Sequence, residues 1–207
     1  MRSIRRALVA LFTTGAATLA VAAPAHAGLL VEGAQDCADA PASRVFQPWL
    51  DPFNYVPAPG GDAESAAGWT MEGGARIVAG NEPWKVGDDA DRSSLLLPAG
   101  SRATTAVMCV GVEHPTMRFF AKRTSGLVLH PLAVEVLFEG LGGAVNRLPI
   151  GTVLAGGSWQ PTLPFPVVAN LLPLLPGEQT PVAFRFTPVG GASWQVDDVY
   201  VDPWRFR

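Results

Sequence analysis

Residues 194–201, with the sequence WQVDDVYV, give the clearest indication of the architecture. Trp194 and Val196 alternate with the period of two that places side chains on one face of a β-strand. Val199 and Val201 alternate on the opposite face, because two aspartates separate the two pairs. A strand with apolar residues on both faces is either covered on both sides or contains a β-bulge that resets its register. We therefore predict a strand here and leave both explanations open.

Six further runs of β-prone residues precede this strand, between closely spaced turn residues. The chain contains 22 glycines and 19 prolines, which interrupt helices and mark turns. Short strands at this spacing are typical of a sandwich or a barrel. The sequence therefore predicts an all-β fold, with strands at 75–78, 94–97, 104–110, 117–122, 132–138 and 181–187.

The first 27 residues have the layout of a cleavable export signal. Three arginines in the first six positions precede an apolar run at 7–22, and small residues occupy positions 25 and 27. A transmembrane anchor is the alternative, but the run is interrupted by polar residues and is shorter than the roughly 20 residues that span a bilayer. We predict a signal peptide at 1–27, a secreted protein that is extracellular or at the cell surface, and no membrane insertion.

The mature chain would have 180 residues, which is the size of one domain. Since the signal peptide holds three of the basic residues and none of the acidic ones, twelve basic residues remain against eighteen acidic residues. An acidic chain without a basic cluster is unsuited to binding nucleic acid or anionic membranes. We therefore predict that nucleic acid is not a partner.

Cys37 and Cys109 are the two cysteines, and both belong to the mature chain. In an oxidising compartment an even number of cysteines indicates a disulfide. The pairing would tie an N-terminal segment, residues 28–57, to a strand in the middle of the chain. Two buried free thiols are the alternative, and zinc would need more cysteine or histidine ligands than this chain offers.

The order of several motifs resembles the galactose-binding-like jelly-roll domain of carbohydrate-binding modules. Residues 59–64 (PGGDAE), followed by Gly-Trp at 68–69, resemble its opening, and 117–122 (MRFFAK) resembles its central strand. Residues 194–202 are similar to its closing strand, Trp-x-Ile-Asp-Asp-Val. One departure is Ala63, where the family has an aromatic residue. The resemblance implies a single jelly-roll β-sandwich at 58–207, after the cleaved signal peptide.

The same resemblance implies a structural calcium site between the first and last strands. Its ligands would be Glu64, Asp197 and Asp198, and carboxylates are ligands that calcium prefers. The alternative is that these acids cap turns and face solvent. A second acidic group at 88–91 lacks the pattern of an EF-hand loop and is typical of a solvated turn. We expect calcium to stabilise the fold rather than to contact a ligand.

Sugar recognition requires aromatic faces and a few polar groups that fix the orientation of the sugar. The aromatic candidates are Trp84, Tyr55 and Trp159, and the polar candidates are Arg118 and Arg185. Trp84 follows a proline in a loop-like stretch and is the best candidate for an exposed ring. The alternative is that these tryptophans belong to the core of the sandwich.

These observations predict a secreted, non-catalytic binding module that binds a glycan, with calcium as a structural cofactor. The alternative is a secreted structural or adhesive surface domain without a small ligand. In that case the apolar, proline-rich stretch 161–181 is a possible contact surface for a protein partner, although it could instead cover the core. We predict no enzymatic activity, because neither G-x-S-x-G nor H-E-x-x-H occurs in the chain.

Overall fold

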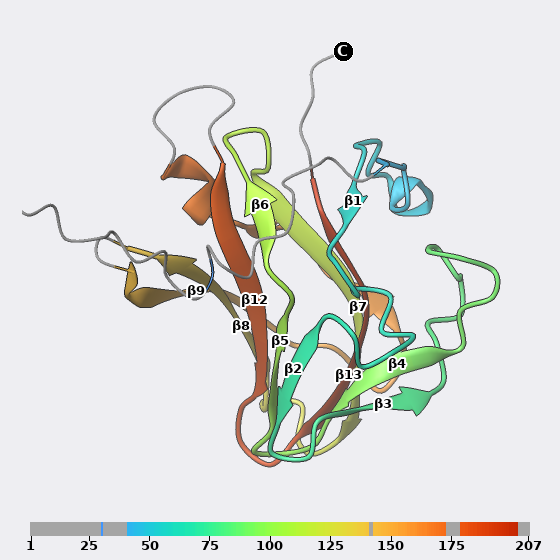
Figure 1. The fold of residues 1–207 in the computed structure, drawn as a ribbon. Helices are drawn as coiled ribbons and strands as arrows, with labels where there is room; N and C mark the ends of the chain where they lie inside the picture. Colours follow the sequence, from blue (N-terminus) through green and yellow to red (C-terminus); the bar gives the residue numbers. More distant parts are fainter. Residues whose placement is uncertain (1–29, 31–40, 141–142, 173–178, 203–207) are drawn as a thin grey trace, which may run out of the picture.

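Two antiparallel β-sheets pack face to face in a computed structural model of the chain (Figure 1). The structure describes residues 30, 41–140, 143–172 and 179–202. Two short 3-10 helices lie among these residues, η1 (Gln47–Trp49) and η3 (Ala169–Leu171). The predicted all-β sandwich is therefore confirmed. The predicted signal peptide at 1–27 lies outside the described residues, as does Cys37, so the export signal and the disulfide stay predictions.

The first sheet has seven strands, and β13 lies at its centre. Five strands form the order β10 (Gln160–Pro161), β7 (Thr116–Ser125), β13 (Ser193–Val201), β4 (Ser93–Leu97) and β3 (Arg76–Ala79). In addition, β1 (Val56–Pro57) pairs with β13, and β11 (Phe165–Pro166) pairs with β7. The sandwich thus begins before residue 58, because β1 is already part of a sheet.

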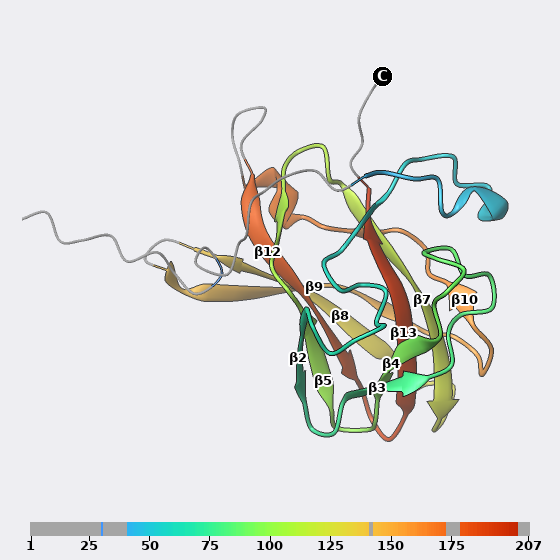
Figure 2. The same ribbon diagram turned by 45° about the vertical axis from the view of Figure 1, so that its right-hand side comes forward.

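The second sheet has six strands around β12. Its order is β2 (Trp69–Glu72), β5 (Arg102–Thr105), β12 (Thr180–Pro188), β8 (Leu132–Glu139) and β9 (Val145–Val153), and β6 (Met108–Val110) also pairs with β12. Figure 2 shows this sheet behind and beside the layer that contains β7 and β13. No helix among the described residues is long and apolar enough to cross a membrane.

Both explanations for the pattern at 194–201 hold at once. Every residue of β13 from Trp194 to Val201 is buried, so both faces of the strand are covered. The register against β7 also shifts, since Asp197 pairs with Phe120 whereas Tyr200 pairs with Arg118. The extra residue is a β-bulge, and Asp198 within it has a positive φ of 50°. The bulge turns the valines on either side of it toward the same core.

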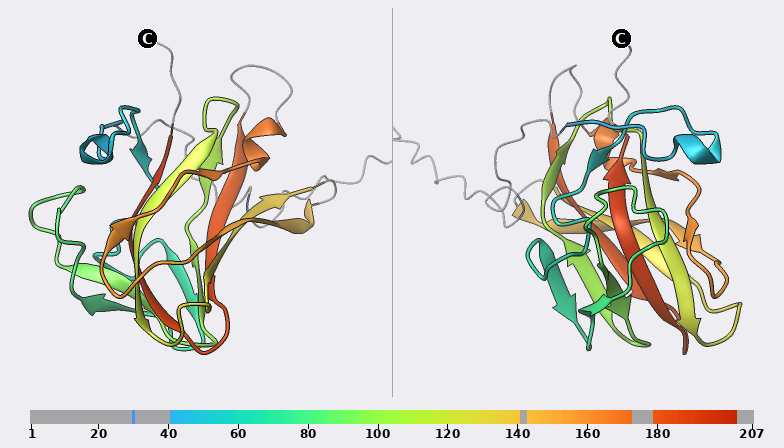
Figure 3. Two further views of the ribbon diagram at one scale, coloured as in Figure 1. Left: turned by 180° about the vertical axis from the view of Figure 1, so that it is seen from behind. Right: turned by 90° about the vertical axis from the view of Figure 1, so that its right-hand side faces the viewer.

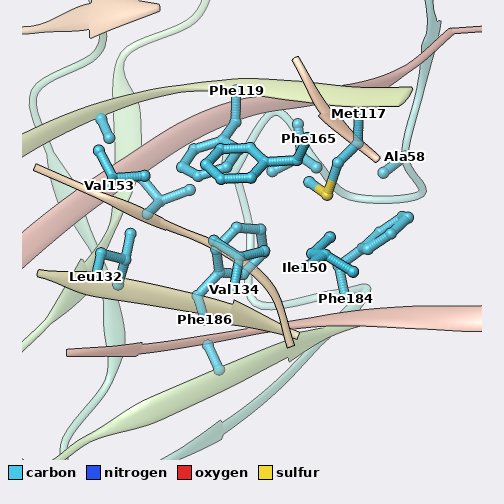
Figure 4. Close-up of a cluster of buried hydrophobic side chains, with 14 of the residues drawn as sticks. Ala58, Met117, Phe119, Leu132, Val134, Ile150, Val153, Phe165, Phe184 and Phe186 are labelled. Atoms are coloured by element: carbon cyan, nitrogen blue, oxygen red, sulfur yellow. The ribbon is translucent and has the colours of Figure 1, made fainter. Parts of the chain in front are cut away.

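The main core lies between the two sheets and consists of aromatic and branched aliphatic side chains (Figure 4). The rings of Phe119 on β7 and Phe186 on β12 meet edge to face, with centroids 5.0 Å apart. Phe165 stacks on Phe119 at 5.8 Å. Since these residues come from both sheets, the aromatic contacts fix the distance between the layers.

A second cluster lies on the outer face of the seven-stranded sheet, away from the main core. It is formed by the chain before β1, which is blue in Figure 3. Phe46 is fully buried there, with ring centroids 5.5 Å from Phe120 and 4.8 Å from Tyr55. The guanidinium carbon of Arg118 lies 4.2 Å from the Phe46 ring centroid. The N-terminal segment is therefore packed onto the sheet by its own side chains.

Several strands differ from the sequence-based expectation. The predicted run 104–110 is divided between β5 and β6, and β2 and β9 were not predicted. In β9, Pro149 and Gly151 pair with consecutive residues of β8, so one residue between them is bulged out. Proline is tolerated in β9 because this strand is at the edge of the sheet. The nine-residue strand was therefore not predicted, because proline and glycine are atypical of strand interiors.

The proline-rich stretch 161–181 combines both of the roles considered for it. It contributes the edge strand β11, and Phe165 and Val167 are buried in the main core. Leu163 and Leu171 are exposed. Residues 173–178 lie outside the described residues.

We expect the substitution Phe46→Ala to destabilise the domain by about 3–5 kcal/mol, because it leaves a cavity between Phe120 and Tyr55. Urea unfolding measures this change. The control is Phe53→Ala, since Phe53 belongs to the same segment but is 47% exposed, and we expect a change within about 0.5 kcal/mol. Equal losses for the two variants would contradict the role assigned to Phe46.

Candidate functional site

The outer face of the seven-stranded sheet carries an aromatic surface, which we define as Trp49, Trp84 and Trp159 with Lys122. Trp84 lies in the loop between β3 and β4 and is 46% exposed. Its ring meets Trp49 edge to face, with centroids 5.0 Å apart and an interplanar angle of 89°. Beneath it, the Phe120 ring of β7 is 5.5 Å away. The exposed ring is therefore held against two others.

Trp159 extends this surface along β7. It immediately precedes β10 and is partly buried against the same cluster. The ammonium nitrogen of Lys122 lies 4.7 Å from its ring centroid. Lys122 and Phe120 are two residues apart on β7 and share its outer face. The structure thus places Trp84 and Trp159, two of the predicted ligand contacts, over the same sheet.

Tyr55 and Arg118 lie beneath this surface and are 1% and 5% exposed. Both contact Asp51: the Tyr55 hydroxyl donates a hydrogen bond of 2.8 Å to its Oδ2 atom, and Arg118 forms an ion pair with the same oxygen. Arg118 also donates a hydrogen bond of 2.8 Å from Nε to the carbonyl of Thr162. These contacts anchor the N-terminal segment, and the two side chains present almost no surface to a ligand.

Arg185 lies on the other sheet, away from the tryptophans. Its Nε atom donates a hydrogen bond of 3.2 Å to the Thr104 hydroxyl, and Glu135 is its partner in register on β8. The structure therefore does not bring Arg185 together with the other predicted contacts. Thr104 and Glu135 are its polar neighbours, whereas Ala183 and Leu137, two residues further along the same strands, are buried in a small hydrophobic cluster.

The loop that carries Trp84 is held by Glu82, which is 1% exposed. Its carboxylate accepts hydrogen bonds from the backbone N–H groups of Trp84 and Val86, the second at 2.8 Å. The backbone N–H of Glu82 in turn donates to Asp197 Oδ2 at 2.9 Å. A carboxylate buried beneath the loop thus fixes the position of the exposed ring. Sequence reasoning missed Glu82, although it lies two residues before Trp84.

Four acidic residues, Glu82, Asp91, Asp197 and Asp198, are buried at the base of this loop. Burial and the neighbouring charge of Asp198 raise the pKa of Asp197 to about 9. Burial and the charges of Glu82 and Asp91 raise the pKa of Asp198 to about 8. The expectation of a solvated turn at 88–91 is thus wrong for Asp91, which is 7% exposed.

The calcium ligands implied by the resemblance are not gathered into one group. Glu64 Oε1 accepts hydrogen bonds from the backbone N–H groups of Arg92 and Ser93, at 2.7 and 2.6 Å. Both oxygens of Asp197 accept backbone hydrogen bonds. In the described part of the chain, no three histidine, cysteine, aspartate or glutamate side chains form a group suited to a metal ion. The set Glu64, Asp197 and Asp198 therefore does not fit calcium as it stands.

Solved carbohydrate-binding modules have similar structures. The CBM22-1 xylan-binding domain from Paenibacillus barcinonensis Xyn10C is 14% identical over 68% of this chain and 90% of that domain, with a TM-score of 0.45. The CBM22-1–GH10 modules of Clostridium thermocellum Xyn10B are 13% identical over 70% of this chain and 27% of that one, with a TM-score of 0.46.

A putative sugar-binding protein from Bacteroides thetaiotaomicron is 10% identical, with a TM-score of 0.42, over 71% of this chain and 92% of that one. The likeness to these structures is one of overall fold. No protein-family model and no curated protein matches the chain.

The raised pKa values of Asp197 and Asp198 predict how stability depends on pH. A carboxyl group whose pKa is higher in the folded state than in the unfolded state stabilises the folded state when it is protonated. This contribution is complete only below the unfolded pKa of about 4, and it is lost as the pH rises through the folded pKa. In chelator, we expect the free energy of unfolding to fall by at least about 2 kcal/mol between pH 5 and pH 9.

Urea unfolding at pH 5, 7 and 9 measures this dependence. The variant Asp198→Asn is the comparison, because its amide is neutral throughout, and we expect it to have a flatter profile than the wild type. Identical slopes for the two proteins would show that Asp198 does not titrate in this range.

Proposed function

We propose that this protein is a secreted, non-catalytic carbohydrate-binding module that holds a sugar on the aromatic surface. The observation that carries the proposal is the exposed indole of Trp84, which packs edge to face against Trp49 over the outer face of the seven-stranded sheet. Sugar rings have an apolar C–H face that packs on aromatic rings. A half-exposed tryptophan supported from below is suited to that contact.

The rigidity of the surface favours binding. The loop of Trp84 is fixed by hydrogen bonds to the Glu82 carboxylate, and the ring is fixed by Trp49 and Phe120. A ligand that binds a preorganised ring does not have to order it, so less conformational entropy is lost. This arrangement distinguishes Trp84 from an isolated exposed side chain on a mobile loop.

Lys122 and Trp159 supply the polar and second aromatic components of the proposed site. The Lys122 ammonium group lies over the Trp159 ring and has three N–H donors for sugar hydroxyl groups. Binding sites for sugars combine such donors with apolar surface. We propose that successive sugar units of an oligosaccharide contact Trp84 and Trp159.

The proposal of binding without catalysis rests on the hydrogen bonds that the carboxylates near the aromatic surface already make. Glu82 and Asp197 use their carboxylates to accept backbone hydrogen bonds beneath the loop. A glycosidase needs two carboxyl groups that flank the scissile bond of a bound sugar. The export signal at 1–27 and the disulfide between Cys37 and Cys109 are further parts of the proposal.

An adhesive or structural role is the second candidate, and exposed leucines favour it. Within the stretch 161–181, Leu163, Leu171 and Leu172 are 82%, 66% and 46% exposed. Exposed apolar side chains close together in the chain mark possible contacts with a protein.

A glycan array probed with the exported protein tests the primary proposal. We expect a signal confined to one class of glycan, with Trp84→Ala lowering the affinity at least about tenfold, because a central aromatic contact contributes about 2 kcal/mol or more. Trp159→Ala should weaken binding in the same direction. Affinities for the oligosaccharide identified on the array are measured by calorimetry.

The matched control is Leu171→Ala, which removes an exposed apolar side chain outside the aromatic surface and should leave the sugar affinity unchanged. Circular dichroism establishes that each variant is folded. A blank array, or an array signal that Trp84→Ala and Trp159→Ala leave intact, would exclude the proposed sugar site and favour the adhesive role.

A further inference from the structure

Exposed aliphatic side chains gather at one end of the sandwich, where short connections join the strands. We define this apolar end as residues 72–76, 97–102, 123–132, 154–158 and 188–193; the turns between β2 and β3 and between β12 and β13 lie at the bottom of Figure 1. Cross-strand pairs hold these connections together, since Leu132 pairs with both Pro188 and Val153. The large apolar side chains exposed there are Leu127, Val128, Leu129, Leu154 and Val189.

Leu127, Val128 and Leu129 are consecutive and form the tip of the connection from β7 to β8. They are 67%, 63% and 81% exposed. The backbone N–H of His130 donates a hydrogen bond of 3.0 Å to the carbonyl of Leu127, which closes the turn. The His130 ring accepts a hydrogen bond of 3.2 Å at Nδ1 from the N–H of Gly191, between β12 and β13. Contacts with a second connection thus fix the turn that carries the three side chains.

The turn itself does not call for aliphatic side chains, because turns favour glycine, proline, asparagine, aspartate and serine. Three large apolar side chains in succession expose surface to water whose burial would be favourable. Such a patch on a folded protein marks a site of contact with another molecule or surface. The exposure of Leu127, Val128 and Leu129 therefore indicates a contact surface at the apolar end.

The charged side chains at the apolar end are mostly arginines, although the chain beyond residue 27 has more acidic than basic residues. The connections that form this end contain Arg76, Arg102, Arg123 and a single acid, Glu72. Glu72 forms an ion pair with Arg102, so its charge is already compensated. Arg76 and Arg123 take part in none of the ion pairs among the described residues. The net charge of the chain argued against an anionic membrane, but the fold places uncompensated positive charge at this end.

Aliphatic side chains beside arginines match a lipid surface more closely than a protein. The residues that dominate protein–protein interfaces are tryptophan, tyrosine and arginine, whereas leucine and valine are under-represented. The large apolar side chains exposed at the apolar end are all leucines and valines. At a bilayer, aliphatic side chains enter the boundary between headgroups and acyl chains, and basic side chains are attracted to anionic headgroups. Both components of such a contact are present at this end of the domain.

We propose that the apolar end binds the surface of a lipid bilayer that contains anionic headgroups. Leu127, Val128 and Leu129 enter the boundary below the headgroups, while Arg76 and Arg123 supply the positive charge that anionic headgroups attract. The contact is peripheral, because a turn of three residues is far too short to cross the roughly 30 Å of hydrocarbon in a bilayer. The aromatic surface lies on the outer face of the seven-stranded sheet, so this inference does not depend on the proposed sugar binding.

Flotation of the exported protein with lipid vesicles tests the proposal. The vesicles consist of phosphatidylcholine mixed with phosphatidylglycerol, and vesicles of phosphatidylcholine alone are the comparison. We expect the protein to float with the mixed vesicles and to bind them about twentyfold more tightly than the neutral ones, because each of two arginines near an anionic surface contributes about fivefold. Since the vesicles carry no sugar, the outcome leaves the proposed function untouched.

Leu129→Ser removes one of the entering side chains, and Leu163→Ser is its matched control. Leu163 is 82% exposed, against 81% for Leu129, but it lies in the loop between β10 and β11, outside the apolar end. We expect Leu129→Ser to weaken binding to the mixed vesicles at least about tenfold, and Leu163→Ser to leave it unchanged. Because both side chains are exposed, both variants should keep the Tm of the wild type, which thermal unfolding measures.

Arg76→Gln tests the electrostatic part of the contact. We expect it to weaken binding to the mixed vesicles about fivefold and to leave binding to the neutral vesicles unchanged. The proposal is overturned if the wild type floats with neither kind of vesicle, or if Leu129→Ser binds as tightly as Leu163→Ser. A dimer in solution that Leu129→Ser dissociates, without vesicle binding by the wild type, would also overturn it and would assign this end to a contact between two copies of the chain.

Discussion

Strand β13 has to be buried on both faces while it carries two adjacent aspartates, and this constraint organises the domain. Its valines and Trp194 pack into the core between the sheets, and Tyr200 packs into the aromatic cluster on the outer face. The bulge at Asp198 makes the two requirements compatible, because it adds one residue to β13 and restores the inward orientation of Val199. The same bulge directs a carboxylate toward the loop that precedes β4.

Covering the outer face of the seven-stranded sheet leaves the aromatic surface at its margin. The N-terminal segment occupies the middle of this face, where Phe46 stacks on Phe120 and Asp51 binds Arg118. Trp84 and Trp159 lie around that segment and keep part of their surface exposed. Residues that would otherwise be ligand contacts, such as Tyr55, are used to anchor the segment. Only the rings at the margin of this region are therefore accessible to a ligand.

The loop between β3 and β4 both supports the aromatic surface and buries acidic side chains. Glu82 holds the backbone of Trp84 from below, and Asp91 lies near the other end of the loop beside Gly87. One loop over β13 thus supports the exposed indole at one end and buries an acidic side chain at the other. Burial of several carboxylates in one place is unfavourable without a cation. The raised pKa values of Asp197 and Asp198 are the consequence of this burial.

The order and spacing of apolar residues determined the class of fold. Alternating runs such as 132–138 and 181–187 became strands, because a period of two can bury only one face of a sheet. Strand β9 was not predicted, since Pro149 and Gly151 are atypical of a strand interior. Proline is tolerated there only because β9 lies at the edge of its sheet. Edge position is a property of the whole sheet.

The site depended on tertiary structure to a greater extent. The sequence indicated Trp84 as an exposed ring, because its proline-containing loop is local information. It could not show that Tyr55 and Arg118 are buried or that Asp91 and Asp198 both lie beside Gly87, since these arrangements join segments that are distant in the chain. Local patterns fix which residues alternate and where the chain turns. Which acids share a space and which rings remain exposed is decided by how the loops and the N-terminal segment cover the sheet.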